Sequence, residues 1–194
     1  MQPENSIVFE IFKGVSFSPH QIDLIENQIE KITLKKGDTL LKVQEIVHFQ
    51  YYVNEGCLRT YFIDQAGKEH TLQFAIKDWW ISDYTAFFSS TPAIMNIECI
   101  QDAILYRISK ASMESLFAEI PQLETFFRKK MEGAFASFQK RILASLAQPA
   151  KERYSAFIKS YPDIEQNVKN YHIASYLGIT TESLSRIRKE SHAK

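Results

Sequence analysis

The longest regular pattern in this 194-residue sequence is a stripe of large apolar side chains at helical spacing. Its members, separated by four, four, four, three and four residues, are Leu123, Phe127, Met131, Phe135, Phe138 and Ile142. This spacing places every member on one face of a single α-helix of about 25 residues. A helix of that length cannot bury its whole stripe against a small sheet, so we expect residues 121–146 to pair with the same helix of a second subunit. The alternative is that the helix packs lengthwise against its own sheet.

A second helix is predicted near the beginning of the chain. Ser18 is a typical N-cap residue, and Pro19 follows it at the first helical position. Three isoleucines come next at helical spacing: Ile22, Ile25 and Ile29. We therefore expect a short amphipathic helix that ends near Lys31.

Between Ile32 and Ser109 the sequence consists of short strand-like runs separated by turns. Residues 65–68, Gln-Ala-Gly-Lys, have the composition of a hairpin loop between two such runs. Short strands with regularly spaced turns favour an antiparallel sandwich or barrel over units in which strands alternate with helices. A short helix should follow from Ser109 to Ile120, so the chain is expected to be of the α+β class.

Basic and acidic residues balance, 23 against 23, but they are unevenly distributed. Residues 151–194 hold 8 Lys/Arg against 5 Asp/Glu, which leaves a net charge of +3, and the preceding 150 residues carry −3. An acidic body with a basic C-terminal segment suits a protein that binds nucleic acid through that segment.

The two cysteines, Cys57 and Cys99, are too few for a four-cysteine zinc or iron–sulfur site, and we expect free thiols. No apolar run approaches the length of a membrane span, and the start of the sequence lacks the features of a secretory signal. A phosphate-binding glycine loop and a nucleophile elbow are also missing. We therefore expect a cytoplasmic protein that is not an enzyme and carries no cofactor or metal.

Residues 170–190 have the order of features that defines a helix-turn-helix. The first helix, NYHIASYL, is followed by Gly178, which suits the left-handed conformation of a helix C-cap. Ile179 then supplies an apolar plug, and Thr180 is a good N-cap for the second helix. The polar face of that second helix can enter the major groove of DNA. The alternative is a three-helix structural cap with a solvated charged face.

The polar residues of this segment divide by expected role. Those expected to read bases in the major groove are Thr181, Glu182, Ser185 and Arg186. Those expected to contact the DNA backbone are His172, Thr180, Arg188 and Lys189. Arginine suits the O6 and N7 acceptors of guanine, and glutamate can accept from cytosine N4.

The run HIASYLGITTESLSRIRKE resembles the C-terminal domain of Crp/Fnr-type bacterial transcription regulators, in the variant familiar from Bacteroidetes-type members. The order of leading helix, short strands, long helix and helix-turn-helix extends the resemblance over essentially the whole chain. It implies a jelly-roll sensor domain that resembles cyclic-nucleotide-binding domains at residues 1–120. A dimerisation helix at 121–147 and a helix-turn-helix domain at 148–194 would follow.

The resemblance also implies a function. The chain would form a homodimer, bind double-stranded DNA at a two-fold-related operator and sense a small-molecule effector, with RNA polymerase as a further candidate partner. In the family's recognition helix, a glutamate and an arginine four residues later read bases, and here they are Glu182 and Arg186. Thr181 stands where the best-known members often carry a base-reading arginine, so the target sequence should differ.

Two departures from the family pattern limit what it implies. Members that bind cyclic AMP carry a Gly-Glu pair followed by an Arg-Ser or Arg-Thr pair, and here no arginine lies between Arg59 and Arg107. A cyclic phosphate buried without a cationic partner is costly, so cyclic AMP is not expected in the usual mode. The cysteine cluster of the oxygen-sensing branch is missing. Only four residues follow Glu190, so a full β-hairpin wing is not expected.

An aromatic cluster in the strand region is a candidate lining for an effector pocket: Trp79, Trp80 and Tyr84. Packing as ordinary core is the alternative reading of that cluster. The competing functional hypothesis is a jelly-roll (cupin-type) small-molecule-binding protein or metal enzyme whose C-terminal helices are structural. His48 and His70 would then be the first metal ligands to test.

Overall fold

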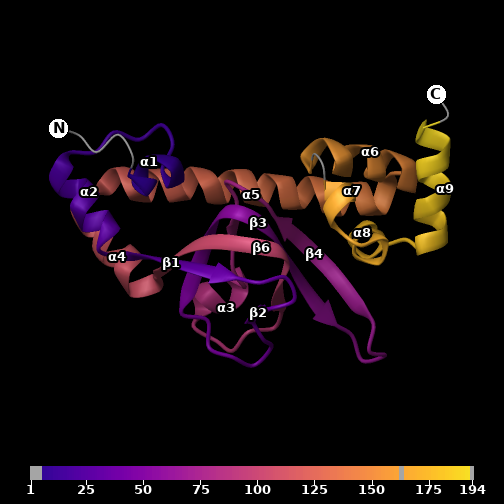
Figure 1. The fold of residues 1–194 in the computed structure, drawn as a ribbon, viewed down its shortest axis with the longest axis horizontal. Coiled ribbons are helices and arrows are strands. Elements are labelled where there is room, and N and C mark those ends of the chain that lie inside the picture. Colours follow the sequence, from indigo (N-terminus) through magenta and orange to yellow (C-terminus); the bar gives the residue numbers. More distant parts are fainter. Residues whose placement is uncertain (1–5, 162–163, 193–194) are drawn as a thin grey trace.

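The computed structural model describes residues 6–161 and 164–192, and α5 (Pro121–Ala147) runs along its long axis (Figure 1). An antiparallel β-roll lies on one side of α5. One end carries α1 (Ile7–Ile11), α2 (Pro19–Glu26) and α4 (Lys110–Glu119). The other end carries four helices, which we call the head: α6 (Ala150–Ser160), α7 (Ile164–Asn167), α8 (Asn170–Leu177) and α9 (Thr181–His192). The expectations of no secretory signal and no wing fall partly on residues 1–5 and 193–194, outside the described residues.

The described strands pair in the order β1-β6-β3-β4, and every pairing is antiparallel. They are β1 (Ile29–Leu34), β2 (Thr39–Leu41), β3 (Phe49–Ile63), β4 (Glu69–Ala75), β5 (Trp80–Ile81) and β6 (Asn96–Ser109). β2 pairs with β6, and β5 pairs with β3. Since β4 ends this order, one of its edges has no strand partner within the described part of the chain. The predicted antiparallel sheet and the hairpin loop at 65–68 are confirmed.

The core of the roll joins residues that are far apart in the sequence. Phe12, which follows α1, is buried among the rings of Phe126 and Phe127 of α5, at centroid distances of 5.3 and 5.9 Å. Trp80 lies 5.0 Å from Phe127 in the same cluster. The start of α5 is therefore part of the core of the roll.

The predicted N-terminal helix begins where expected and ends earlier. Ser18 and Gln21 form a capping box, in which each side chain accepts a hydrogen bond from the backbone N–H of the other. The helix ends at Glu26 rather than near Lys31, and Ile29 belongs to β1. Ile29 pairs with Ile108 of β6, so long-range strand pairing overrides the helical spacing of the isoleucines.

The long helix is confirmed, and its stripe divides into two parts. Leu123, Phe126 and Phe127 are buried against the roll. Beyond Met131 the large apolar side chains are exposed, from Ile142 at 45% to Leu146 at 80%. Lengthwise packing against the chain's own sheet, the alternative considered for this helix, therefore covers only its first turns.

Candidate nucleic-acid interface

The turn between α8 and α9 has the backbone conformation that its sequence predicts. Gly178 has φ +66° and ψ +36°, in the left-handed region. Its N–H donates to the carbonyl of Ser175, and the N–H of Ile179 donates to the carbonyl of Ala174. These bonds close the end of α8 and bring the chain directly into α9.

α9 is anchored by a narrow apolar side and begins at a side-chain cap. Leu184 is fully buried, and Ile187 is nearly so. The N–H of Ser183 donates to Oγ1 of Thr180 at 3.2 Å, so Thr180 is the cap that the sequence predicts. The Thr180 hydroxyl therefore caps α9 and lies at the exposed start of that helix.

The opposite side of α9 is polar and exposed. Glu182, Ser185, Arg186 and Lys189 follow one another at helical spacing and are all exposed, whereas Thr181 is half-buried. We call these four exposed residues the reading face. The backbone N–H of Glu182 and the Thr180 and Thr181 hydroxyls lower the pKa of the Glu182 carboxyl, which is therefore ionised at neutral pH.

Arg188 is not on the reading face, and the structure corrects the DNA-backbone role expected for it. Its Nε lies 2.5 Å from Oε1 of Glu165 in α7, and Nη1 donates to Oδ1 of Asn170 in α8. The Arg188 guanidinium thus links α9 to the two preceding elements of the head. A side chain held by a carboxylate and an amide is not presented to a phosphate.

His172 also departs from its expected role as a contact to the DNA backbone. Its side chain is 7% exposed, with Nε2 3.9 Å from Oε1 of Glu98 in β6. Burial, together with the nearby Arg59 guanidinium, lowers the pKa of His172 to about 4. His172 is therefore a neutral residue between the head and the roll, because α8 packs on the sheet through this side.

The face of α8 that meets the roll consists of His172, Ser175 and Tyr176. Ser175 Oγ accepts from the N–H of Thr71 and donates to the carbonyl of Glu69, both at 2.9 Å. The ring of Tyr176 lies 5.5 Å from that of Phe74, a fully buried residue of β4. The spacing of these three positions is i, i+3, i+4, so a second packed face of α8 was present in the sequence and was not recognised.

Beneath this contact lies a buried arginine of β3. Arg59 is 1% exposed and forms ion pairs with Glu69 of β4 and Glu98 of β6. It donates to Oγ1 of Thr71 at 3.2 Å and stacks on the ring of Tyr61, 4.0 Å from the centroid. The buried cation is thus compensated by two carboxylates, one from each strand beside β3.

The three aromatic residues expected to line an effector pocket have different surroundings. Trp79 stacks against Tyr161 at the end of α6, 5.2 Å between centroids. Trp80 lies in the core cluster of the roll, and Tyr84 is half-buried beside Phe87 of α3 (Tyr84–Ser89). This distribution favours the alternative of ordinary core packing over a common pocket lining.

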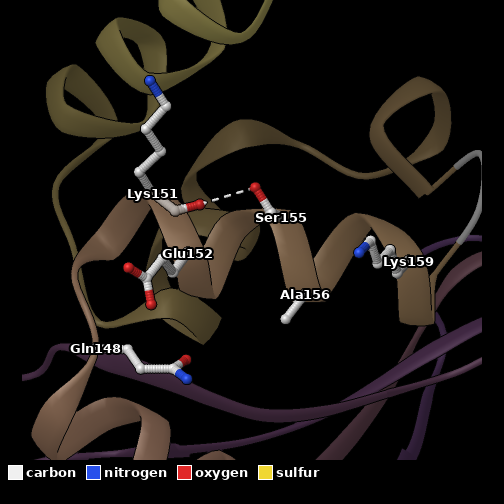
Figure 2. Close-up of a pocket in the computed structure, with 6 residues that line it drawn as sticks. All are labelled: Gln148, Lys151, Glu152, Ser155, Ala156 and Lys159. Carbon is white, nitrogen blue, oxygen red and sulfur yellow. Dashed lines mark hydrogen bonds between the residues drawn. The ribbon is translucent and has the colours of Figure 1, made fainter.

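Two surface hollows lie on or beside the head. One, of about 300 Å³, lies between α8 and the β3–β4 hairpin, and its lining includes Thr181 and Lys68. The other, of about 440 Å³, follows the outer side of α6 (Figure 2). There the Ser155 hydroxyl donates to the carbonyl of Lys151 within the same helix. Neither hollow includes the reading face.

The competing metal-enzyme hypothesis gains no support from the histidines. His70 Nε2 lies 2.7 Å from Oδ2 of Asp64 at the β3–β4 hairpin, and His48 lies beside the ring of Phe49. The described residues contain no group of three or more potential metal ligands among His, Cys, Asp and Glu. Within residues 6–161 and 164–192, no helix has the length and apolar character needed to cross a bilayer.

Comparisons with known proteins agree with this architecture. The cyclic nucleotide-binding domain family matches residues 31–119. The chain is 24% identical over 202 residues to the anaerobic regulatory protein of Aggregatibacter actinomycetemcomitans, which covers 95% of this chain and 76% of that protein. It is 23% identical over 184 residues to the fumarate and nitrate reduction regulatory protein of Escherichia coli (strain K12), covering 89% and 73%.

Solved structures show the same fold. FixK2 from Bradyrhizobium japonicum superposes with a TM-score of 0.73 at 18% identity and covers 85% of each chain. A transcriptional regulator of the Crp/Fnr family from Eubacterium rectale gives a TM-score of 0.70 at 19% identity, covering 91% of this chain and 84% of that one. Residues 31–119 thus form a cyclic nucleotide-binding domain, and over most of its length the chain is similar to transcription regulators of the Crp/Fnr type.

Proposed function

We propose that two copies of the chain pair along α5 and present their two α9 helices to successive major grooves of an inverted-repeat operator. The observation that carries this proposal is the exposed reading face of α9, at the far end of the molecule from α1 and α2 (Figure 1). In a two-fold dimer both reading faces lie at that same end. Half-sites should then be centred about one helical turn, roughly 34 Å, apart.

The support for dimerisation is the part of the α5 stripe that the roll leaves uncovered. Five large apolar side chains of α5 are exposed: Phe135, Phe138, Ile142, Leu143 and Leu146. A contiguous apolar face of this kind on a helix is typical of an interface between subunits. In the proposed division of labour, residues 1–120 sense a signal, 121–147 dimerise and 148–194 bind DNA.

The four reading-face residues are proposed to have distinct roles. Arg186 and Glu182 read base edges, with Ser185 beside them and Thr181 at the start of the helix. Lys189 contacts a phosphate and fixes the register of the helix in the groove. Thr180, at the exposed start of α9, is the remaining candidate for a backbone contact.

The roll is proposed to sense an unidentified effector. That effector is not cyclic AMP bound in the mode usual for the family. In members that bind cyclic AMP, the arginine that binds the phosphate lies in the stretch that corresponds to residues 60–106. The two arginines on either side of this stretch both form ion pairs, Arg59 with Glu69 and Glu98, and Arg107 with Glu30 at 2.7 Å. Neither is a free cation for a buried phosphate. An effector would act by shifting the population of dimers whose heads are positioned to bind DNA.

Selection of fragments from the source genome with the purified full-length chain tests the proposed function. Repeated binding and amplification should enrich fragments that share an inverted repeat, with half-sites about one turn apart. Enrichment of fragments without any shared repeat would contradict sequence-specific reading by a two-fold dimer. A variant with both Arg186 and Lys189 replaced by alanine serves as the control and should enrich nothing.

A further inference from the structure

The edge of β4 that faces away from β3 carries backbone groups without a strand partner. An edge of this kind attracts other hydrogen-bonding groups, and proteins usually cover it. Here a hydroxyl of the head covers part of that edge. Ser175 Oγ accepts from the N–H of Thr71 and donates to the carbonyl of Glu69, as the next strand of a sheet would do.

This use of a serine inside a helix is unusual. A serine in that position ordinarily donates to the carbonyl four residues earlier in its own helix, as Ser155 of α6 does to Lys151. Ser175 instead directs its hydroxyl across the boundary between the head and the roll. Since both strand groups lie on β4, the contact fixes the position of α8 along that strand.

Two further contacts hold the same boundary. Arg141 of α5 donates to the carbonyl of Leu72, the next residue along the β4 edge, and its guanidinium lies 4.6 Å from the centre of the Tyr176 ring. Tyr176 in turn packs on Phe74. These contacts join the long helix, the roll and α8. Tyr161 at the end of α6 also bonds the backbone of Phe74, and from α8 the Ser175 hydroxyl bonds the backbone of the strand.

The covalent connection to the head is short and leaves its orientation open. α5 ends at Ala147 and α6 begins at Ala150, with Gln148 in an extended conformation between them. α8 and α9 are rigidly joined through the closed turn at Gly178. The orientation of α9 relative to α5 is therefore set by this hinge and by where α8 rests on β4.

We propose that Ser175 is a positioning residue that locks α8 onto the β4 edge and thereby sets the spacing of DNA half-sites that the dimer accepts. This inference rests on the proposed function, because a spacing exists only for a dimer that reads two half-sites. Two locked heads fit one distance between half-sites. Two heads released from β4 turn about the Gln148 hinge and accept neighbouring distances as well.

Ser175→Ala tests the lock without DNA, and Ser155→Ala is the matched control because its hydroxyl bonds only within α6. The readout is hydrogen exchange of the Thr71 amide, whose N–H donates a hydrogen bond to Ser175 Oγ. Exchange at Thr71 should rise by about tenfold in Ser175→Ala and stay unchanged in Ser155→Ala, as expected when one or two hydrogen bonds are lost. Unchanged exchange at Thr71 in Ser175→Ala would overturn the lock.

The second arm measures binding to operators whose half-sites are moved closer or apart by one base pair, and to a single half-site. Wild type should prefer one spacing, and Ser175→Ala should lose about fivefold to tenfold of that preference while keeping its single half-site affinity. A merely structural defect would instead weaken all of these DNAs together, which contradicts the proposal. If wild type binds no half-site at all, the proposed function fails, and the exchange of Thr71 still decides whether the lock exists.

Discussion

Arg59 of β3 and Glu98 of β6 face each other directly across the two strands, and their side chains form an ion pair beneath the head. The Arg59 guanidinium also pairs with Glu69 and donates to Thr71, the two β4 residues whose backbone groups bind Ser175. One buried cation thus organises the strand edge on which α8 rests. Its removal would leave two carboxylates close together without a compensating charge.

Arg59→Met should lower the free energy of unfolding by about 3 kcal/mol, because a partly buried carboxylate pair loses the cation that both carboxylates contact. Chemical denaturation at fixed protein concentration measures the change. Arg107→Met is the matched control, since Arg107 also pairs with a glutamate, Glu30, and stacks on a ring, Phe49, but at the exposed surface. The control should cost less than about 1 kcal/mol. Equal losses in both variants would contradict the role assigned to Arg59.

The lowered pKa of His172 should make the stability of the fold depend on pH. Burial holds its pKa near 4 in the folded chain, against an ordinary value of 6.5, so the folded state binds fewer protons than the unfolded state between these values. Stability is therefore fully present above about pH 6.5 and falls as the pH is lowered toward 4, by about 3 kcal/mol at most. The groups facing His172 are Glu98, Arg59, Glu69 and Lys169.

The measurement is the free energy of unfolding at several values between pH 7 and pH 5. His172→Gln should flatten this pH dependence, because glutamine does not titrate. His20→Gln is the control, since His20 is exposed on α2, and it should keep the slope of the wild type. If His172→Gln kept the wild-type slope, another group would be responsible.

Arg186→Ala should weaken binding to the preferred operator by about 1–3 kcal/mol and relax the choice of base at the position that Arg186 reads. Lys189→Ala should weaken binding to all sequences by a similar factor and reduce its salt dependence. Titration of fluorescent duplexes at two salt concentrations separates these outcomes. A uniform loss in Arg186→Ala would show that Arg186 contacts phosphate rather than bases.

A charge placed on the uncovered α5 stripe should dissociate the dimer. Leu146→Glu puts a carboxylate on the most exposed of these apolar side chains, at 80%, where burial against a partner would desolvate it. Sedimentation equilibrium should show a dimer for wild type and a monomer for the variant. Gln139→Glu, also exposed on α5, adds the same charge and should remain dimeric. A monomeric wild type would contradict the proposed pairing.

Patterns within a few residues of one another were readable in the sequence. The N-cap at Ser18, the long helix at 121–147 and the closed turn at Gly178 all depend on local backbone preferences. The reading face of α9 was equally readable, because the buried side of a short helix leaves its other side to solvent. The end of the first amphipathic helix could not be read from the sequence, because Ile29 pairs in the sheet with Ile108, a residue far along the chain.

The sequence by itself determined that this chain has a strand-rich body, a long helix with an apolar stripe and a helix-turn-helix. Only the tertiary structure decided how these parts meet. It buried His172, paired Arg188 with Glu165, and directed Ser175 to the edge of β4. Each of these outcomes depends on which groups from distant segments lie within a few ångströms. A polar residue on a helix looks the same in sequence whether solvent, DNA or a strand edge faces it.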